Sequence, residues 1–198
     1  METISLAIQK GGTGKTTTLV GLADMLSRDH DVLVIDADAQ CNASRWLMGK
    51  GPGEYDPGPT LLHWTTGQED LSGLARSTPL GPDLVPAHPR MNAHLEGKPP
   101  VYIKDLTSAL SHYDFCLIDT PPYLGSPVWA ALSASQHVIV PIQLEGLAIE
   151  GFQGFEEALE AARTRFETNV GVLGLFANQV DVRRNETEQG WNFLQKHF

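Results

Sequence analysis

The stretch KGGTGKTT, residues 10–17, combines glycines with a lysine and hydroxyl side chains. Glycines let a backbone approach phosphate oxygens closely, and the free N–H groups at the start of a helix attract anions. In such a loop Lys15 supplies a positive charge for β- and γ-phosphates, and Thr16 supplies a hydroxyl ligand for Mg²⁺. The sequence therefore predicts a phosphate-binding loop, whose members are Gly11, Gly12, Thr13, Gly14, Lys15, Thr16 and Thr17.

Two features of this loop leave alternatives open. The strict phosphate-loop pattern has a glycine five positions before Gly14, but Gln9 stands there and Lys10 precedes the glycine pair. Thr17 lies in the first turn of the expected helix, where its hydroxyl either donates to an α-phosphate or caps the helix.

Strands and helices alternate around these residues. After the loop, Leu19, Leu22, Ala23 and Leu26 lie at helical spacing, and a second helical pattern begins at Ala148. Uninterrupted apolar strands are typical of a parallel sheet that is buried on both faces. We therefore expect an α/β fold, a doubly wound and mostly parallel sheet flanked by helices, with ligands at the carboxyl ends of its strands. The expected strands are residues 3–9, 32–36, 115–119, 137–142 and 171–179.

The chain of 198 residues predicts a single domain, at roughly 150 residues per domain. Residues 51–100 differ in texture, because 16 of these 50 positions are Gly or Pro. We expect an irregular insertion there, with one short strand at residues 84–87. The last residues, 185–198, are typical of a terminal helix.

Charge and cysteine content exclude several classes. There are 14 Lys+Arg against 24 Asp+Glu, and a net charge of −10 opposes non-specific binding to nucleic acid or anionic membranes. Cys41 and Cys116 are too few for a disulfide framework or a four-cysteine zinc site, and we interpret both as structural. The chain has neither a signal-peptide pattern nor a long apolar stretch, so we expect a cytoplasmic protein.

Several motifs in order resemble one family. KGGTGKTT is similar to the deviant Walker A motif of the ParA/MinD family of P-loop ATPases, and the chain is most like a small ParA-type partitioning ATPase. VIDADAQCNAS (34–44) resembles the next family segment, CLIDTPP (116–122) the Walker B and switch segment, and VIVPIQ (138–143) the following strand. The resemblance covers most of residues 1–180 outside the insertion, and it implies the P-loop NTPase fold with ATP and Mg²⁺ as cofactors.

The resemblance also implies roles for single residues. Lys10 matches the signature lysine that reaches the partner's phosphates in a nucleotide-sandwich dimer, although a surface lysine beside a glycine turn is the alternative. Asp38 matches the carboxylate that orients the attacking water and helps to hold the metal's water shell. Asp119 matches the Walker B carboxylate, so Thr16, Asp38 and Asp119 form the implied Mg²⁺ set.

Two further positions stay open. Asp36 is either a supporting residue behind the metal site or only the carboxylate that ends a strand. Asn178 ends the last expected strand, where family members often place an asparagine that reads adenine. The sequence NQVD (178–181) also resembles the guanine-reading arrangement of GTPases.

The implied function is a slow, Mg²⁺-dependent ATP hydrolase that dimerises with ATP and segregates or positions DNA or other cargo. A ParB-like or cargo adaptor protein would stimulate it. Non-specific DNA binding has little support, because residues 113–198 hold 5 Lys+Arg against 11 Asp+Glu, and only Arg183, Arg184 and Lys196 offer a small patch. A tail that is acid-rich before Trp191 disfavours membrane targeting. The alternative function is a metabolic P-loop ATPase that activates a small carboxylate for amide or ligase-type chemistry.

Overall fold

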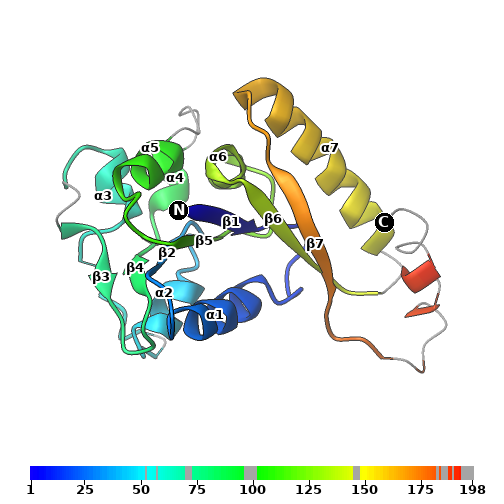
Figure 1. Cartoon of the computed structure of the whole chain (residues 1–198), viewed down its shortest axis with the longest axis horizontal. Helices are drawn as coiled ribbons and strands as arrows, with labels where there is room; N and C mark the ends of the chain where they lie inside the picture. Colours follow the sequence, from blue (N-terminus) through cyan, green and yellow to red (C-terminus); the bar gives the residue numbers. More distant parts are fainter. Residues whose placement is uncertain are drawn as a thin grey trace.

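The computed structural model describes residues 1–51, 53–56, 58–69, 73–95, 102–144, 148–181, 183, 187–188 and 190–192. Its strands form one sheet in the order β3-β4-β2-β5-β1-β6-β7 (Figure 1). β3 pairs antiparallel with β4, and the other pairings are parallel. The strands are β1 Glu2–Leu6, β2 Val32–Asp36, β3 Arg76–Ser77, β4 Asp83–Val85, β5 Phe115–Asp119, β6 His137–Ile142 and β7 Gly171–Ala177.

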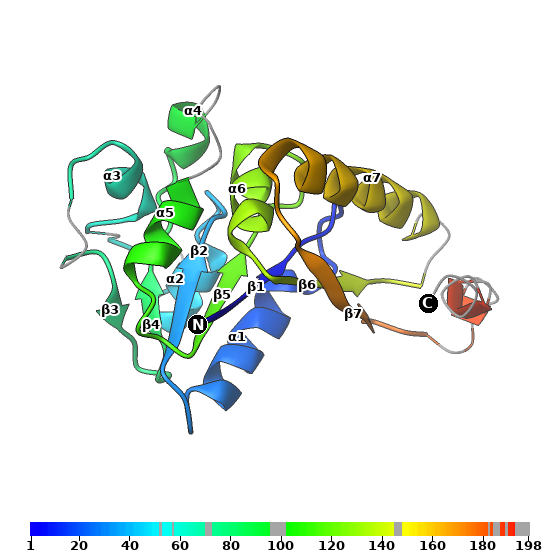
Figure 2. The ribbon, with the colours of Figure 1, turned by 45° about the horizontal axis from the view of Figure 1, so that its top comes forward.

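Helices cover both faces of this sheet. α1 and α2 lie on one face, whereas α5, α6 and α7 lie on the other, as the two ribbon views show (Figures 1 and 2). The helices are α1 Lys15–Leu26, α2 Asn42–Leu47, α3 Leu61–Thr65, α4 Met91–Leu95, α5 Tyr102–Ala109, α6 Ser126–Ala134 and α7 Ala148–Phe166. The expected doubly wound α/β fold is therefore confirmed.

β2 shows why an uninterrupted apolar run forms a strand here. Leu33 and Ile35 pack into the core under α5 and α6, whereas Val32 and Val34 pack into the core under α1. Successive strand side chains point to opposite faces, so a strand that is covered on both faces must be apolar at every position. Asp36 follows at the carboxyl end of the strand, beside Asp119 of β5.

Several boundaries differ from the expected ones. β1 ends at Leu6 instead of residue 9, because the chain leaves the sheet to begin the glycine loop, and β7 ends at Ala177 instead of residue 179. The segment 51–100 contributes α3, α4 and two strands, β3 and β4, at one edge of the sheet. The short strand expected at residues 84–87 is β4, which lies at 83–85. Of the expected terminal helix, residues 187–188 and 190–192 are helical, and its other positions, like Arg184 and Lys196, lie outside the described residues.

A buried carboxylate ties three elements together at the carboxyl end of β2. Asp36 is fully buried, and its Oδ1 accepts the N–H of Asp38 at 3.0 Å. Its Oδ2 accepts both the N–H and the hydroxyl of Ser44 in α2, at 2.8 and 2.6 Å. The Ser44 hydroxyl accepts the N–H of Ala87, just after β4, at 3.0 Å. Burial raises the pKa of Asp36 even though these hydrogen bonds favour its charged form.

Asp36 is thus a supporting residue, since its hydrogen bonds hold the turn that carries Asp38. We predict that Ser44→Ala lowers the free energy of unfolding by about 1 to 3 kcal/mol, because the buried Ala87 N–H loses its acceptor and Asp36 loses a donor. Urea denaturation measures this change. Ser108→Ala removes an exposed hydroxyl that bonds within its own helix, and we expect it to cost less than about 0.5 kcal/mol. Equal effects of the two substitutions would contradict this role of the Ser44 hydroxyl.

Candidate functional site

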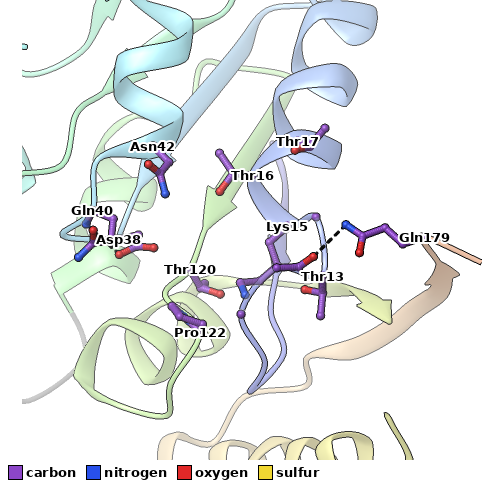
Figure 3. A pocket seen from close by; sticks show the side chains of 13 residues that line it. Thr13, Lys15, Thr16, Thr17, Asp38, Gln40, Asn42, Thr120, Pro122 and Gln179 are labelled. Carbon is purple, nitrogen blue, oxygen red and sulfur yellow. Dashed lines mark hydrogen bonds between the residues drawn. The ribbon is translucent and has the colours of Figure 1, made fainter. Parts of the chain in front are cut away.

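The carboxyl ends of the strands and the glycine loop enclose one pocket of about 320 Å³ (Figure 3). All seven residues expected in the phosphate loop line it, together with Asp38. The pocket therefore brings together groups from the β1–α1 loop and from the turn after β2. The lining also contains residues that the sequence analysis did not select, namely Gln40, Asn42, Thr120, Pro122 and Gln179.

The loop backbone is shaped by two glycines. Gly12 and Gly14 have φ values of 75° and 92°, a left-handed conformation that side chains other than glycine rarely adopt. A Cβ at Gly14 would also collide with the amide nitrogen of Asn178. Both glycines are therefore required by the geometry of the loop.

The N–H groups of the loop are free. Among the described residues, none of the backbone N–H groups of residues 11–17 has a hydrogen-bond acceptor, and the first to donate is that of Thr18, to the carbonyl of Gly14 at 2.9 Å. Consecutive free N–H groups at the start of a 12-residue helix form a site of positive potential. This arrangement suits an anion with several oxygens.

Lys15 is buried inside this site. Only 7% of the residue is exposed, and its Nζ donates to the carbonyl of Lys10 at 3.0 Å. Burial lowers the pKa of Lys15, whereas the negative charges of Asp119 and Asp38 act in the opposite direction. An ammonium group held in such surroundings gains from an added anionic partner.

Thr16 lines the pocket and is hydrogen-bonded to the buried carboxylate of Asp119 behind it. The Thr16 hydroxyl donates to Asp119 Oδ2 at 2.7 Å, and the other oxygen, Oδ1, is buried without a hydrogen-bond partner in the described structure. Burial, followed by the neighbouring charge of Asp36, raises the pKa of Asp119. A hydroxyl and carboxylates are the hard oxygen donors that Mg²⁺ prefers, so these residues fit that ion.

Asp38 lies across the pocket from the loop (Figure 3). It is 7% exposed, and its Oδ1 accepts the N–H of Gln40 at 2.9 Å. In the described part of the chain, no three His, Cys, Asp or Glu side chains converge as metal ligands. A cation here would therefore take most of its ligands from water and from the bound anion.

Three expected site residues do not line the pocket, namely Lys10, Asp119 and Asn178. Lys10 is partly exposed, and its carbonyl rather than its side chain contacts Lys15. The Asn178 amide donates to the carbonyl of Thr13 at 3.0 Å, and its Oδ1 accepts the N–H of Gln179 at 2.9 Å. The amide of Asn178 thus contacts the loop backbone.

The sequence analysis did not predict two glutamines that contact the phosphate loop. Gln143 follows β6 and Gln179 follows β7, and both donate to the carbonyl of Gly12, at 3.0 and 3.2 Å. The available signal was their position, since polar residues that follow parallel strands gather at the ligand-binding edge of the sheet.

The two cysteines are buried and lie outside the pocket lining. Cys41 has a φ of 55°, a left-handed conformation that glycine adopts more readily than residues with a side chain. Burial raises the pKa of both thiols, so neither is an activated nucleophile.

Among the described residues, no helix combines the length and apolar character needed to cross a bilayer.

Comparisons with known proteins agree with this geometry. A family model described as an AAA domain matches residues 1–172. The chromosome-partitioning ATPase Soj of Thermus thermophilus is 36% identical, over 98% of this chain and 76% of that protein. The chromosome partitioning protein ParA of Caulobacter vibrioides is 31% identical, over 100% of this chain and 77% of that protein.

Among solved structures, cobyrinic acid a,c-diamide synthase from Mycobacterium smegmatis, with a bound ATP analog and magnesium, matches with a TM-score of 0.87. The identity is 25%, and the match covers 100% of this chain and 80% of that one. The same fold thus serves proteins with different names and activities. On the sequence matches over nearly its whole length, this chain belongs to the ParA/Soj family of P-loop ATPases.

Proposed function

We propose that this protein is a partitioning ATPase that binds ATP and Mg²⁺ at residues 11–17 and hydrolyses the nucleotide slowly. The observation that carries the proposal is one pocket that combines free loop N–H groups and Lys15 with Asp38. Thr16 lines this pocket and donates to the buried carboxylate of Asp119. The partition proteins Soj and ParA among its relatives support the same function.

Each group of the pocket has a role in this proposal. The N–H groups of the loop and the Lys15 ammonium bind the β- and γ-phosphates, and Thr17 donates to the α-phosphate. Thr16, Asp38 and Asp119 hold Mg²⁺, partly through water. When bound, this ion neutralises the charge that develops on the phosphate oxygens. Asp38 also orients the attacking water, because it is a buried carboxylate that faces the loop across the pocket.

Lys10 acts on the second subunit. Its side chain is not part of the lining of its own pocket, so it is available to a partner molecule. A cation added at the transferring phosphoryl group in this way stabilises the transition state as an arginine finger does. The protein would then dimerise with ATP, separate after hydrolysis, and act in the cytoplasm with a ParB-like or cargo adaptor protein.

A second candidate rests on the similarity to cobyrinic acid a,c-diamide synthase. In that case the pocket would use the phosphate of ATP to activate a small carboxylate for amide or ligase-type chemistry. ATP turnover separates the two. Stimulation by DNA or by an adaptor protein favours partitioning, whereas turnover that depends on a carboxylate substrate and an amine donor favours the metabolic reaction.

We predict that Lys10→Ala loses the ATP-dependent dimer and about 10³-fold in turnover, while one subunit still binds ATP. Sedimentation with and without ATP measures the dimer, and a nucleotide titration measures binding. Lys104→Ala removes an exposed lysine from α5, and we expect it to behave as the wild type. An unaltered dimer in the Lys10 variant would remove this residue from the interface.

We predict that Asp38→Ala retains ATP binding and loses at least about 100-fold in the rate of hydrolysis, because the attacking water is no longer oriented. Single-turnover hydrolysis and a nucleotide titration measure the two effects separately. Asp56→Ala removes a carboxylate outside the pocket lining and serves as the control. Near-normal turnover of the Asp38 variant would refute the role of this carboxylate.

A further inference from the structure

Side chains that follow β6 and β7 hold carbonyl groups of the phosphate loop. Gln143 and Gln179 both donate to the carbonyl of Gly12, at 3.0 and 3.2 Å, and their side-chain amides also contact each other. Asn178 donates to the next carbonyl, that of Thr13, at 3.0 Å. Figure 3 shows Gln179 approaching the loop from the β7 side.

We propose that Gln143 and Gln179 form a glutamine brace, a pair of positioning residues that orients the N–H groups of the loop toward the phosphates. The proposal rests on the function proposed above, because it concerns the same pocket. The brace raises the affinity for the triphosphate and does not contact the base of the nucleotide.

The planar peptide unit links the brace to the pocket. In a trans peptide the C=O of one residue and the N–H of the next point in opposite directions. When two amides hold the Gly12 carbonyl on the β7 side of the loop, the N–H of Thr13 must point away from them. The same reasoning applies to Gly14, whose preceding carbonyl is held by Asn178. Without these donors, a glycine-rich loop has other peptide orientations available.

The conformation of the second glutamine supports a built contact. Gln179 has a φ of 55°, which is unfavourable for a residue with a side chain. Its N–H donates to Asn178 Oδ1, and this local bond holds the strained residue against the loop. Gln179 is exposed, so its side chain could be solvated without contacting the loop.

Because both glutamines share one acceptor, their effects should not be independent. After the loss of one donor, the other still holds the Gly12 carbonyl; after the loss of both, nothing in the described structure replaces them. We therefore expect the double variant to lose more affinity than the two single variants together.

The experiment compares Gln143→Met, Gln179→Met and the double variant, since methionine keeps the length of the side chain and removes the donor. Isothermal titration with Mg²⁺ measures binding of two probes, ATP and inorganic tripolyphosphate. We expect each single variant to lose about 2-fold and the double variant about 10-fold or more, equally for both probes. Gln68→Met changes an exposed glutamine outside the pocket and serves as the control.

Thermal unfolding of the ligand-free variants within about 2 °C of the wild type would show that the loss is local. Full affinity of the double variant for both probes would overturn the brace and leave the proposed function intact. A loss for ATP but not for tripolyphosphate would also overturn it, because it would indicate contact with the base. A wild type that binds neither probe would overturn both proposals.

Discussion

A loop that binds phosphate with its backbone must leave its N–H groups unpaired while its carbonyls keep their partners. Residues 11–17 meet the first condition, because none of their N–H groups has an acceptor among the described residues. The second condition is met by hydrogen-bond donors from several parts of the chain. Lys15 holds the carbonyl of Lys10, and side chains that follow β6 and β7 hold those of Gly12 and Thr13. The parallel sheet makes this possible, because it delivers the ends of distant segments to one edge.

The buried acidic residues show two different solutions to the same desolvation cost. Asp36 is fully buried, but three hydrogen bonds satisfy its carboxylate, and the residue connects the Asp38 turn, α2 and the end of β4. Asp119 lies beside it at the end of the neighbouring strand, and one of its oxygens has no hydrogen-bond partner among the described residues. A satisfied buried carboxylate supports the fold, whereas an incompletely satisfied one invites a cation. The two carboxylates thus differ in how far their hydrogen bonds satisfy them.

The scaffold alone does not decide between partitioning and carboxylate activation. Soj and ParA are similar to this chain in sequence, and a diamide synthase is similar to it in structure, because one fold can serve different activities. A shared fold leaves the surface that meets a second macromolecule or substrate free to differ. In this chain the net charge of −10 disfavours contacts with polyanions except at a local basic patch.

The sequence by itself determined the sheet class and the bounds of three strands, and it predicted a phosphate loop. Apolar runs such as VLVID indicate strands that are buried on both faces, and glycines followed by a lysine are typical of an anion-binding loop. It left the role of Asp36 open and did not select Gln143 and Gln179. Those assignments depend on which atoms from distant segments lie within hydrogen-bond reach. Only the tertiary structure decides this, because the crossover connections of the parallel sheet, rather than local spacing, bring residues 12, 143 and 179 together.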